Sequence, residues 1–254
     1  MIDRIRQAQA NGLPSFGSWI SIADGNSAEI MAQAGFDWLI LDMQHGGIDA
    51  HSCAGILRAV ELSGIQALVR VPGNDQAQIM RALDLGAAGV IVPMVCDANQ
   101  ARHAAEAVRY PPAGIRSFGK VRSYYSEDRA PLDPLCFVMV ETADAIANLD
   151  EIAATPGVDG LFVGPVDLSL SLGLGLSMNL EDPVLEAIDQ TVAACGKYGK
   201  IAGCPAFSPE SAQVLVRHGV TFVTIGADIG FVRRGAAEMA ALAGNLRESF
   251  LGNT

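Results

Sequence analysis

Basic side chains are scarce in this sequence. Lysine and arginine together number 17 against 28 aspartates and glutamates, which leaves a formal net charge of −11 at neutral pH. A protein that binds along a nucleic acid needs clustered basic side chains to neutralise the phosphates. The composition therefore argues against a nucleic-acid partner.

Long apolar runs and paired cysteines are missing as well. No stretch reaches the roughly 18 apolar residues that a membrane-spanning helix requires, and the charged N-terminal segment lacks the apolar core of a secretory signal. The five cysteines are odd in number and widely spaced, which predicts free, buried thiols rather than a disulfide framework. These absences predict a cytoplasmic protein with no membrane partner.

Phosphate-binding glycine motifs are absent too, because neither Gly-x-Gly-x-x-Gly nor a Walker-type loop follows any apolar run. The sequence instead alternates apolar runs with helical patterns. Eight short apolar, β-rich runs predict strands over residues 16–22, 37–43, 66–72, 89–95, 137–142, 160–165, 200–207 and 221–228. Apolar residues at helical spacing between them predict helices, for example over 27–35, 77–87, 99–110, 145–155 and 183–199.

This alternation predicts the fold class. The expected strands are continuously apolar, which is typical of a parallel sheet covered on both faces. Eight β-α units within 254 residues indicate a (β/α)8 TIM barrel rather than an open doubly wound sheet. We expect residues 1–254 to form this barrel as a single domain.

Two connections depart from the alternation of expected strands and helices. Residues 111–136 are rich in Pro, Gly, Arg and Tyr and have no helical periodicity. Long irregular connections in compact domains are usually functional or disordered. Arg116, Lys120 and Arg122 favour a loop that covers an anionic ligand, and a plain surface excursion is the alternative. A second excursion, 167–182, follows the sixth expected strand and should lie over the same end of the barrel.

Polar residues gather where the expected strands end, which is where barrel enzymes place their chemistry. They are Asp42 and His45 after the second strand, Arg70 late in the third, Glu141 at the end of the fifth and Asp167 after the sixth. Each one alone would equally suit a helix cap, a solvated turn or a structural role. Together they predict one active site.

Glu141 and Asp167 suit a metal ion. Two carboxylates without a cysteine or histidine cluster favour a hard divalent ion such as Mg²⁺ or Mn²⁺. If an α-keto acid chelates that ion, the ion polarises the keto group and stabilises an enolate. Arg70 would hold the same oxyanion, and backbone N–H groups of the turn from Gly164 to Asp167 would receive the substrate carboxylate.

Proton transfer needs a group that titrates near neutrality. His45 is the histidine at an expected strand end, so it is the candidate base. Asp42, three residues earlier, would fix the tautomer of its ring, as the carboxylate does in a Ser-His-Asp triad. His51, His103 and His218 fall in or near helical segments, where we expect a surface role.

Several longer stretches are specific enough to indicate a family. They include LDMQHGGID from Leu41, LVRVPGND from Leu68, YPPAGIR from Tyr110 and GVDGLFVGPVDLS from Gly157. Through them the chain, from Gly17 to about Ala236, resembles the metal-dependent pyruvate aldolases of the HpcH/HpaI family. The resemblance implies reversible cleavage of a 4-hydroxy-2-keto acid to pyruvate and an aldehyde, without a Schiff-base lysine.

The resemblance also implies a role for each candidate residue. Glu141 and Asp167 would be the protein ligands of Mg²⁺, Mn²⁺ or Co²⁺, with pyruvate chelated beside them. Arg70 would pair with the pyruvate oxyanion, and His45, backed by Asp42, would take part in proton transfer. Further substrate contacts would come from Trp19 near the aldehyde, Gly164 and Val166 at the pyruvate carboxylate, and Met139 near pyruvate.

Members of the family are typically homo-oligomers, namely hexamers built as trimers of dimers that exchange a C-terminal helix between subunits. In this chain the alanine-rich segment 231–246 is the candidate for that helix, and the alternative is that it covers its own barrel. The chain departs from many members at Gln44, Ser117 and Met139, where they carry Glu, Gly and Gln. These departures bear on the aldehyde accepted, on pyruvate binding and on the preferred metal.

Other functions remain as alternatives. The same enolate chemistry supports oxaloacetate decarboxylation, or cleavage of a coenzyme A thioester as in the related citrate lyase and malyl-CoA lyase group. The latter would need basic residues for the nucleotide, which this acidic chain does not offer. A barrel without catalysis that serves as a binding or assembly protein is the third reading, and the joint presence of all five strand-end residues argues against it.

Overall fold

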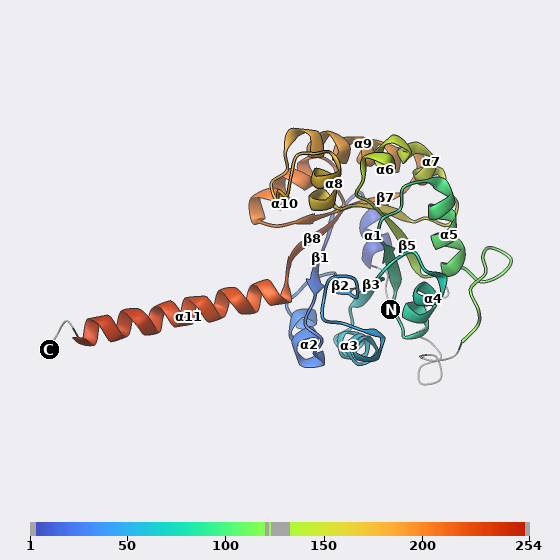
Figure 1. The fold of residues 1–254 in the computed structure, drawn as a ribbon. Coiled ribbons are helices and arrows are strands. Elements are labelled where there is room, and N and C mark those ends of the chain that lie inside the picture. Colours follow the sequence, from blue (N-terminus) through green and yellow to red (C-terminus); the bar gives the residue numbers. More distant parts are fainter. Residues whose placement is uncertain (1–3, 120–121, 123–132, 252–254) are drawn as a thin grey trace.

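The computed structural model describes residues 4–119, 122 and 133–251. Eight parallel strands close into a barrel in chain order, with β1 paired to both β2 and β8 (Figure 1). The strands are β1 (Ser15–Ile20), β2 (Trp38–Asp42), β3 (Gln66–Arg70), β4 (Gly89–Val92), β5 (Leu135–Val140), β6 (Gly160–Val163), β7 (Ile201–Ala206) and β8 (Phe222–Ala227). The predicted (β/α)8 TIM barrel is confirmed.

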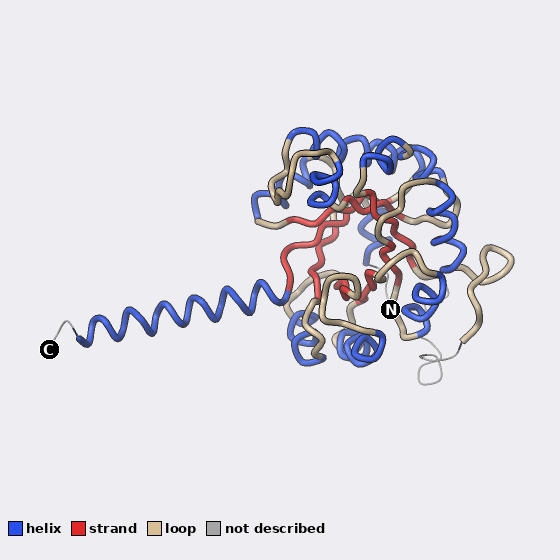
Figure 2. The backbone as a smooth tube through the Cα atoms, viewed as in Figure 1, coloured by secondary structure: helices blue, strands red, loops and turns tan. Residues whose placement is uncertain are grey.

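Helices lie between successive strands, where they surround the barrel (Figure 2), and one further helix precedes β1 and one follows β8. They are α1 (Arg4–Ala10), α2 (Gly25–Gln33), α3 (Ala50–Leu62), α4 (Gln76–Asp84), α5 (Ala98–Val108), α6 (Ala143–Ala147), α7 (Leu149–Ala154), α8 (Pro165–Ser171), α9 (Asp182–Tyr198), α10 (Pro209–Arg217) and α11 (Asp228–Leu251). One prediction was wrong, since residues 145–155 do not form a single helix. They divide between α6 and α7 at Asn148, where ψ rises to 15° and the helix is interrupted.

Aromatic side chains fill the interior of the barrel. The ring of Trp38 stacks on that of Phe222 with centroids 3.7 Å apart, and Phe137 stacks on Phe222 at 4.6 Å. Gly17 on β1 makes room for this stack, because a Cβ there would overlap the Trp38 ring. Ile5 of α1 is buried in the same cluster. The interior of the barrel is thus filled by packed side chains, so a ligand site is expected at its carboxyl end.

The long connection 111–136 is irregular in its described part, and Lys120 lies outside the described residues. Arg116 is buried and pairs with Asp84 at the end of α4, with nitrogen and oxygen 3.0 Å apart. Arg122 pairs with Glu61 of α3. The expectation that these two arginines face an anionic ligand is therefore wrong, because carboxylates of the same chain engage them.

The last helix projects away from the barrel rather than covering it (Figure 1). α11 extends beyond the expected 231–246 at both ends, and the alternative that it covers its own barrel is wrong. Its large apolar side chains are exposed at Ile229, Val232, Met239, Leu242, Leu246 and Phe250. Among the described residues, no helix combines the length and apolarity needed to cross a membrane.

Candidate active site

Asp42 and Arg70 form an ion pair at the carboxyl end of the barrel. They end β2 and β3 and lie opposite each other in the strand register. Arg70 donates from Nε to Asp42 Oδ1 over 2.9 Å and from a terminal nitrogen to Oδ2 over 2.7 Å. Burial acts to raise the pKa of Asp42, but the hydrogen bond and charge of Arg70, with two backbone N–H groups, hold that pKa below its usual value. Asp42 is therefore ionised and fixes the orientation of Arg70.

The expected hydrogen bond between Asp42 and the ring of His45 is not formed among the described residues. Asp42 Oδ1 instead accepts from the backbone N–H groups of Gln44 and His45, each over 3.1 Å. The strand register places Arg70 beside Asp42. The turn after β2 places the backbone N–H of His45, rather than its ring, next to the Asp42 carboxylate. The His45 side chain is exposed at this end of the barrel.

Trp19 forms a wall next to Arg70. The guanidinium carbon of Arg70 lies 4.5 Å from the centre of the Trp19 ring, within the range of a cation–π contact. The indole nitrogen donates to Thr224 Oγ1 over 2.8 Å, and Phe162 meets the ring edge-on at 5.9 Å. The indole is therefore held from three sides.

Glu141 is the most buried acid of the site, with 2% of its surface exposed. Its Oε1 accepts a hydrogen bond from the backbone N–H of Met94 over 2.7 Å. Met94 has a φ of 56°, a left-handed conformation that costs energy for a residue with a side chain. Burial and the nearby charge of Asp167 raise the pKa of Glu141, against the opposing effects of Met94 and Arg70.

Asp167 lies in the first turn of α8, directly after β6, and close enough to Glu141 to raise its pKa. Gly164 allows this approach, because a Cβ at that position would overlap the Glu141 carboxylate. Glu141 is buried and Asp167 is exposed, and a cation between two such like charges would stabilise both, since carboxylate oxygens suit a hard divalent ion. No group of three or more His, Cys, Asp or Glu suited to a metal occurs in the described part of the chain. Water or substrate oxygens would therefore complete the coordination.

A cavity of about 240 Å³ opens at this end of the barrel. The predicted site residues that line it are Trp19, Asp42, Arg70, Met139, Gly164, Val166 and Asp167. Glu141 lies behind Gly164, and His45 is outside the lining. The cavity is smaller than the ~300–1,000 Å³ usual for larger ligands, so its size suits a small keto acid.

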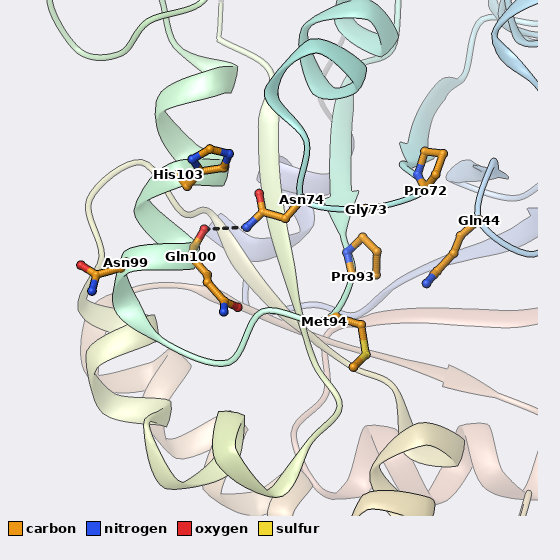
Figure 3. Close-up of a pocket in the computed structure, with 9 residues that line it drawn as sticks. All are labelled: Gln44, Pro72, Gly73, Asn74, Pro93, Met94, Asn99, Gln100 and His103. Atoms are coloured by element: carbon orange, nitrogen blue, oxygen red, sulfur yellow. Dashed lines mark hydrogen bonds between the residues drawn. The ribbon is translucent and has the colours of Figure 1, made fainter.

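The structure places further residues at the site that no sequence pattern indicated as functional. Ser21, Phe162, Pro165, Pro205, Phe207 and Ala227 also line the cavity. Most of them are apolar or small, and only their position near the ends of expected strands would have indicated them. Met94 contributes through a backbone N–H, which no side-chain pattern reveals. Gln44 faces a second cavity, which contains His103 as well (Figure 3).

The closed parallel barrel, with a cavity lined by Asp42, Arg70 and Asp167 at its carboxyl end, has the architecture of a TIM-barrel enzyme. The family model described as HpcH/HpaI aldolase/citrate lyase matches residues 15–234. The chain belongs to the HpcH/HpaI aldolase/citrate lyase family, as the resemblance predicted.

Individual relatives are similar over most of their length. The 2-dehydro-3,6-dideoxy-6-sulfogluconate aldolase of Pseudomonas putida is 40% identical over 88% of this chain and 90% of its own. The hydroxypyruvate/pyruvate aldolase of Deinococcus radiodurans is 39% identical over 93% of this chain and 88% of its own. A solved HpcH/HpaI aldolase/citrate lyase family protein from Burkholderia cenocepacia has a TM-score of 0.86 and 30% identity, covering 95% of this chain and 99% of that one. Both sequence relatives carry the names of aldolases, which are carbon–carbon lyases.

Proposed function

We propose that this chain is a class II pyruvate aldolase, which reversibly cleaves a 4-hydroxy-2-keto acid to pyruvate and an aldehyde with a divalent metal ion. The observation that carries the proposal is one small cavity lined by Asp167 and the Arg70–Asp42 pair, with the carboxylate of Glu141 directly behind Gly164 in its wall. The aldolase names of the relatives support the same reaction type. The proposal assigns this activity to residues 1–254 as a single catalytic domain.

Glu141 and Asp167 would hold Mg²⁺, Mn²⁺ or Co²⁺. When bound, the ion would supply Lewis-acid polarisation of the keto group. The raised pKa of Glu141 supports this assignment, because burial and the nearby charge of Asp167 destabilise its ionised carboxylate. A carboxylate in that condition gains stability when a cation arrives.

The binding of pyruvate rests on other residues of the chain. Arg70 would donate its remaining N–H groups to the keto oxygen, where negative charge develops during cleavage. Asp42 keeps the guanidinium in place, so little reorganisation is needed. The backbone N–H groups of Val166 and Asp167, in the first turn of α8 after Gly164, would receive the carboxylate of pyruvate, and Met139 would pack against it.

The aldehyde half would lie toward Trp19, whose ring is already fixed against Arg70. We assign proton transfer at the C4 hydroxyl to His45, which would take the proton on cleavage and return it on synthesis. Its exposed ring supports this role, because an exposed imidazole can exchange that proton with solvent.

We further propose a homohexamer, a trimer of dimers, in which α11 is exchanged between subunits. The exposed apolar side chains of α11 support this arrangement. A matching hollow of about 560 Å³ lies beside α10 and is lined mainly by apolar residues, including Phe16, Ala212, Val216 and Ile225. A cytoplasmic location is proposed from the five free cysteines.

Metal removal tests the proposed reaction. Protein stripped with a chelator should form no adduct from pyruvate and a hydroxyaldehyde, and Mg²⁺, Mn²⁺ or Co²⁺ should restore adduct formation. Activity that survives chelation and is trapped by borohydride would show a Schiff-base enzyme and refute the class II assignment.

A further inference from the structure

Asp228 is a buried acid to which the proposed reaction assigns no role. It is the first residue of α11 and directly follows Ala227, which lines the active-site cavity. Only 1% of its surface is exposed, and the ion pairs found among the described residues do not include it. Burying a carboxylate is costly unless hydrogen bonds compensate. The partners of Asp228 therefore indicate what this acid is placed to hold.

Those partners are backbone N–H groups of two separate segments. Oδ1 of Asp228 accepts from Ser21 over 2.9 Å and Oδ2 accepts from Ile22 over 3.0 Å, both in the loop after β1. Oδ1 also accepts from Ile229 over 2.7 Å, in the first turn of α11. The start of a helix accounts only for the last of these bonds. The other two use both carboxylate oxygens to hold two successive N–H groups of the loop.

Ser21 in turn holds the turn after β2, which contains His45. The carbonyl of Ser21 accepts from the N–H of Gly47 over 2.8 Å. A Cβ at Gly46 would overlap the carbonyl oxygen of Asp42 and lie 3.2 Å from Cα of Ser21. His45 directly precedes these two glycines, and its own N–H donates to Asp42. The backbone of His45 is therefore held by Asp42 on one side and by Ser21 on the other.

The start of α11 is itself fixed where the helix leaves the barrel (Figure 1). Gly226 has a left-handed φ of 67°, and a Cβ there would overlap the ring of Phe231 in the first turn of α11. The hydroxyl of Ser18 on β1 donates to the carbonyls of Ile225 and Gly226, each over 3.1 Å. Asp228 therefore extends from a fixed base when it binds the loop after β1.

We propose that Asp228 is a positioning residue, which ties the first turn of α11 to the loop after β1 and thereby sets the turn that carries His45. The inference rests on the proposed aldolase function, in which His45 transfers a proton. Asp228 is not among the residues that line the cavity, so it acts through Ser21. An amide cannot replace its carboxylate, because one end of an amide is a donor and would face an N–H group.

The four histidines of the chain allow a direct test of position. Protein labelled with ¹³C at histidine Cε1 gives one ring signal for each, and loss of a signal in His45→Ala identifies that of His45. We expect Asp228→Asn to move or broaden the His45 signal and to leave the other three in place. Asp228→Ser keeps an acceptor for the start of α11 and serves if the amide variant fails to fold.

Asp24→Asn is the matched control. Asp24 lies in the same loop after β1, is exposed, and caps α2 by accepting from the N–H of Ser27 over 2.9 Å. Asparagine caps a helix as well as aspartate does. This variant therefore removes the same charge from the loop and should leave all four signals in place.

A double-mutant cycle tests the consequence for catalysis. The measured rate is the formation of adduct from pyruvate and glycolaldehyde by the Mn²⁺-loaded enzyme. Asp228→Asn should lower kcat about ten- to a hundredfold when His45 is present, because a misplaced reacting group slows the step steeply. In the His45→Ala background it should lower kcat by less than about twofold, because the group it positions is already missing.

Two results would overturn the inference alone. One is a His45 signal that does not move in the Asp228 variant, and the other is a kcat that is unchanged or falls by the same factor in both backgrounds. Absence of adduct in wild type, together with no metal-dependent exchange of the C3 protons of pyruvate, would overturn the proposed function instead. The ring signals would then still report whether Asp228 sets the turn.

Discussion

Arg70 binds the carboxylate of Asp42 at two points, with side chains that are only 12% and 6% exposed. The pair spans adjacent strands, so it holds β2 and β3 together at the edge of the site. It also gives Arg70 one orientation, with its remaining N–H groups free to meet a substrate oxygen. Asp42 therefore orients the arginine, and among the described residues the ring of the exposed His45 has no hydrogen bond to a carboxylate.

Removing Arg70 should destabilise the fold. Arg70→Met leaves Asp42 buried without a cation, which costs about 3–5 kcal/mol for a buried pair. The double variant Asp42→Asn/Arg70→Met should recover most of that loss, because no charge is left unpaired. Urea unfolding of the metal-free proteins at neutral pH measures both values. Equal destabilisation in the single and double variants would contradict the pairing.

The same pair predicts a pH dependence. The pKa of Asp42 is lowered in the folded protein, so its contribution is present above the usual carboxyl pKa and is lost as pH falls through the lowered value. In Arg70→Met burial should raise the pKa of Asp42, and protonation then relieves the cost. We expect the destabilisation by Arg70→Met to shrink as pH falls from neutral into the carboxyl range, and a constant difference would argue against this cause.

Glu141→Gln should separate stability from metal binding. Because the folded pKa of Glu141 is raised, the native state holds its proton longer than the unfolded chain, and stability falls as pH rises through that window. At neutral pH the metal-free Glu141→Gln protein should therefore have a Tm equal to or above that of wild type. Mn²⁺ should raise the Tm of wild type and leave that of the variant unchanged. A metal-induced rise of equal size in both proteins would remove Glu141 from the metal site.

Gly164→Ala should damage the metal site through its shape. A Cβ at position 164 would overlap the Glu141 carboxylate and lie 3.2 Å from the terminal carbon of Met139. We expect Mn²⁺ affinity, followed by calorimetry, to fall at least tenfold. The matched control is Gly196→Ala in α9, where a Cβ meets nothing within 4 Å. That change should stabilise the protein by about 0.5–1 kcal/mol with unaltered metal affinity. Equal affinities in both variants would contradict the close approach.

A charge on the apolar face of α11 should disrupt assembly. Leu242 is 50% exposed in the single chain, and burial of an unpaired charge at an interface is costly. Leu242→Glu should therefore shift the mass measured by light scattering toward smaller species. Ala237→Glu, on the other side of the same helix by its 3.6-residue period, introduces the same charge and should leave the mass unchanged. If neither variant altered the mass, α11 would have no part in the assembly.

Much of the fold and of the candidate site could be predicted from the sequence, because the patterns that indicate strands and strand ends lie within short stretches of the chain. Strands buried on both faces have continuous apolar runs, and polar side chains that interrupt them at the carboxyl end, such as Arg70, Glu141 and Asp167, are conspicuous. These patterns require no knowledge of which strands are neighbours.

Features that depend on neighbours could not be predicted in this way. Whether Asp42 pairs with Arg70 or with His45 is decided by register between strands. The contribution of Met94 comes from a backbone N–H, and its residue type carries no information about it. The periodicity of α11 indicates a helix with an apolar face but does not say whether that face packs on its own barrel.

Exchange of the C3 protons of pyruvate with deuterated water, followed by NMR without any aldehyde, tests the central claim most directly. It reports enolisation alone and is independent of the natural acceptor. We expect no enzyme-catalysed exchange in metal-free wild type, exchange on addition of Mn²⁺ or Mg²⁺, and none in Glu141→Gln under the same conditions. Exchange that proceeds equally without metal, or equally in Glu141→Gln, would contradict a metal-dependent pyruvate aldolase at this site.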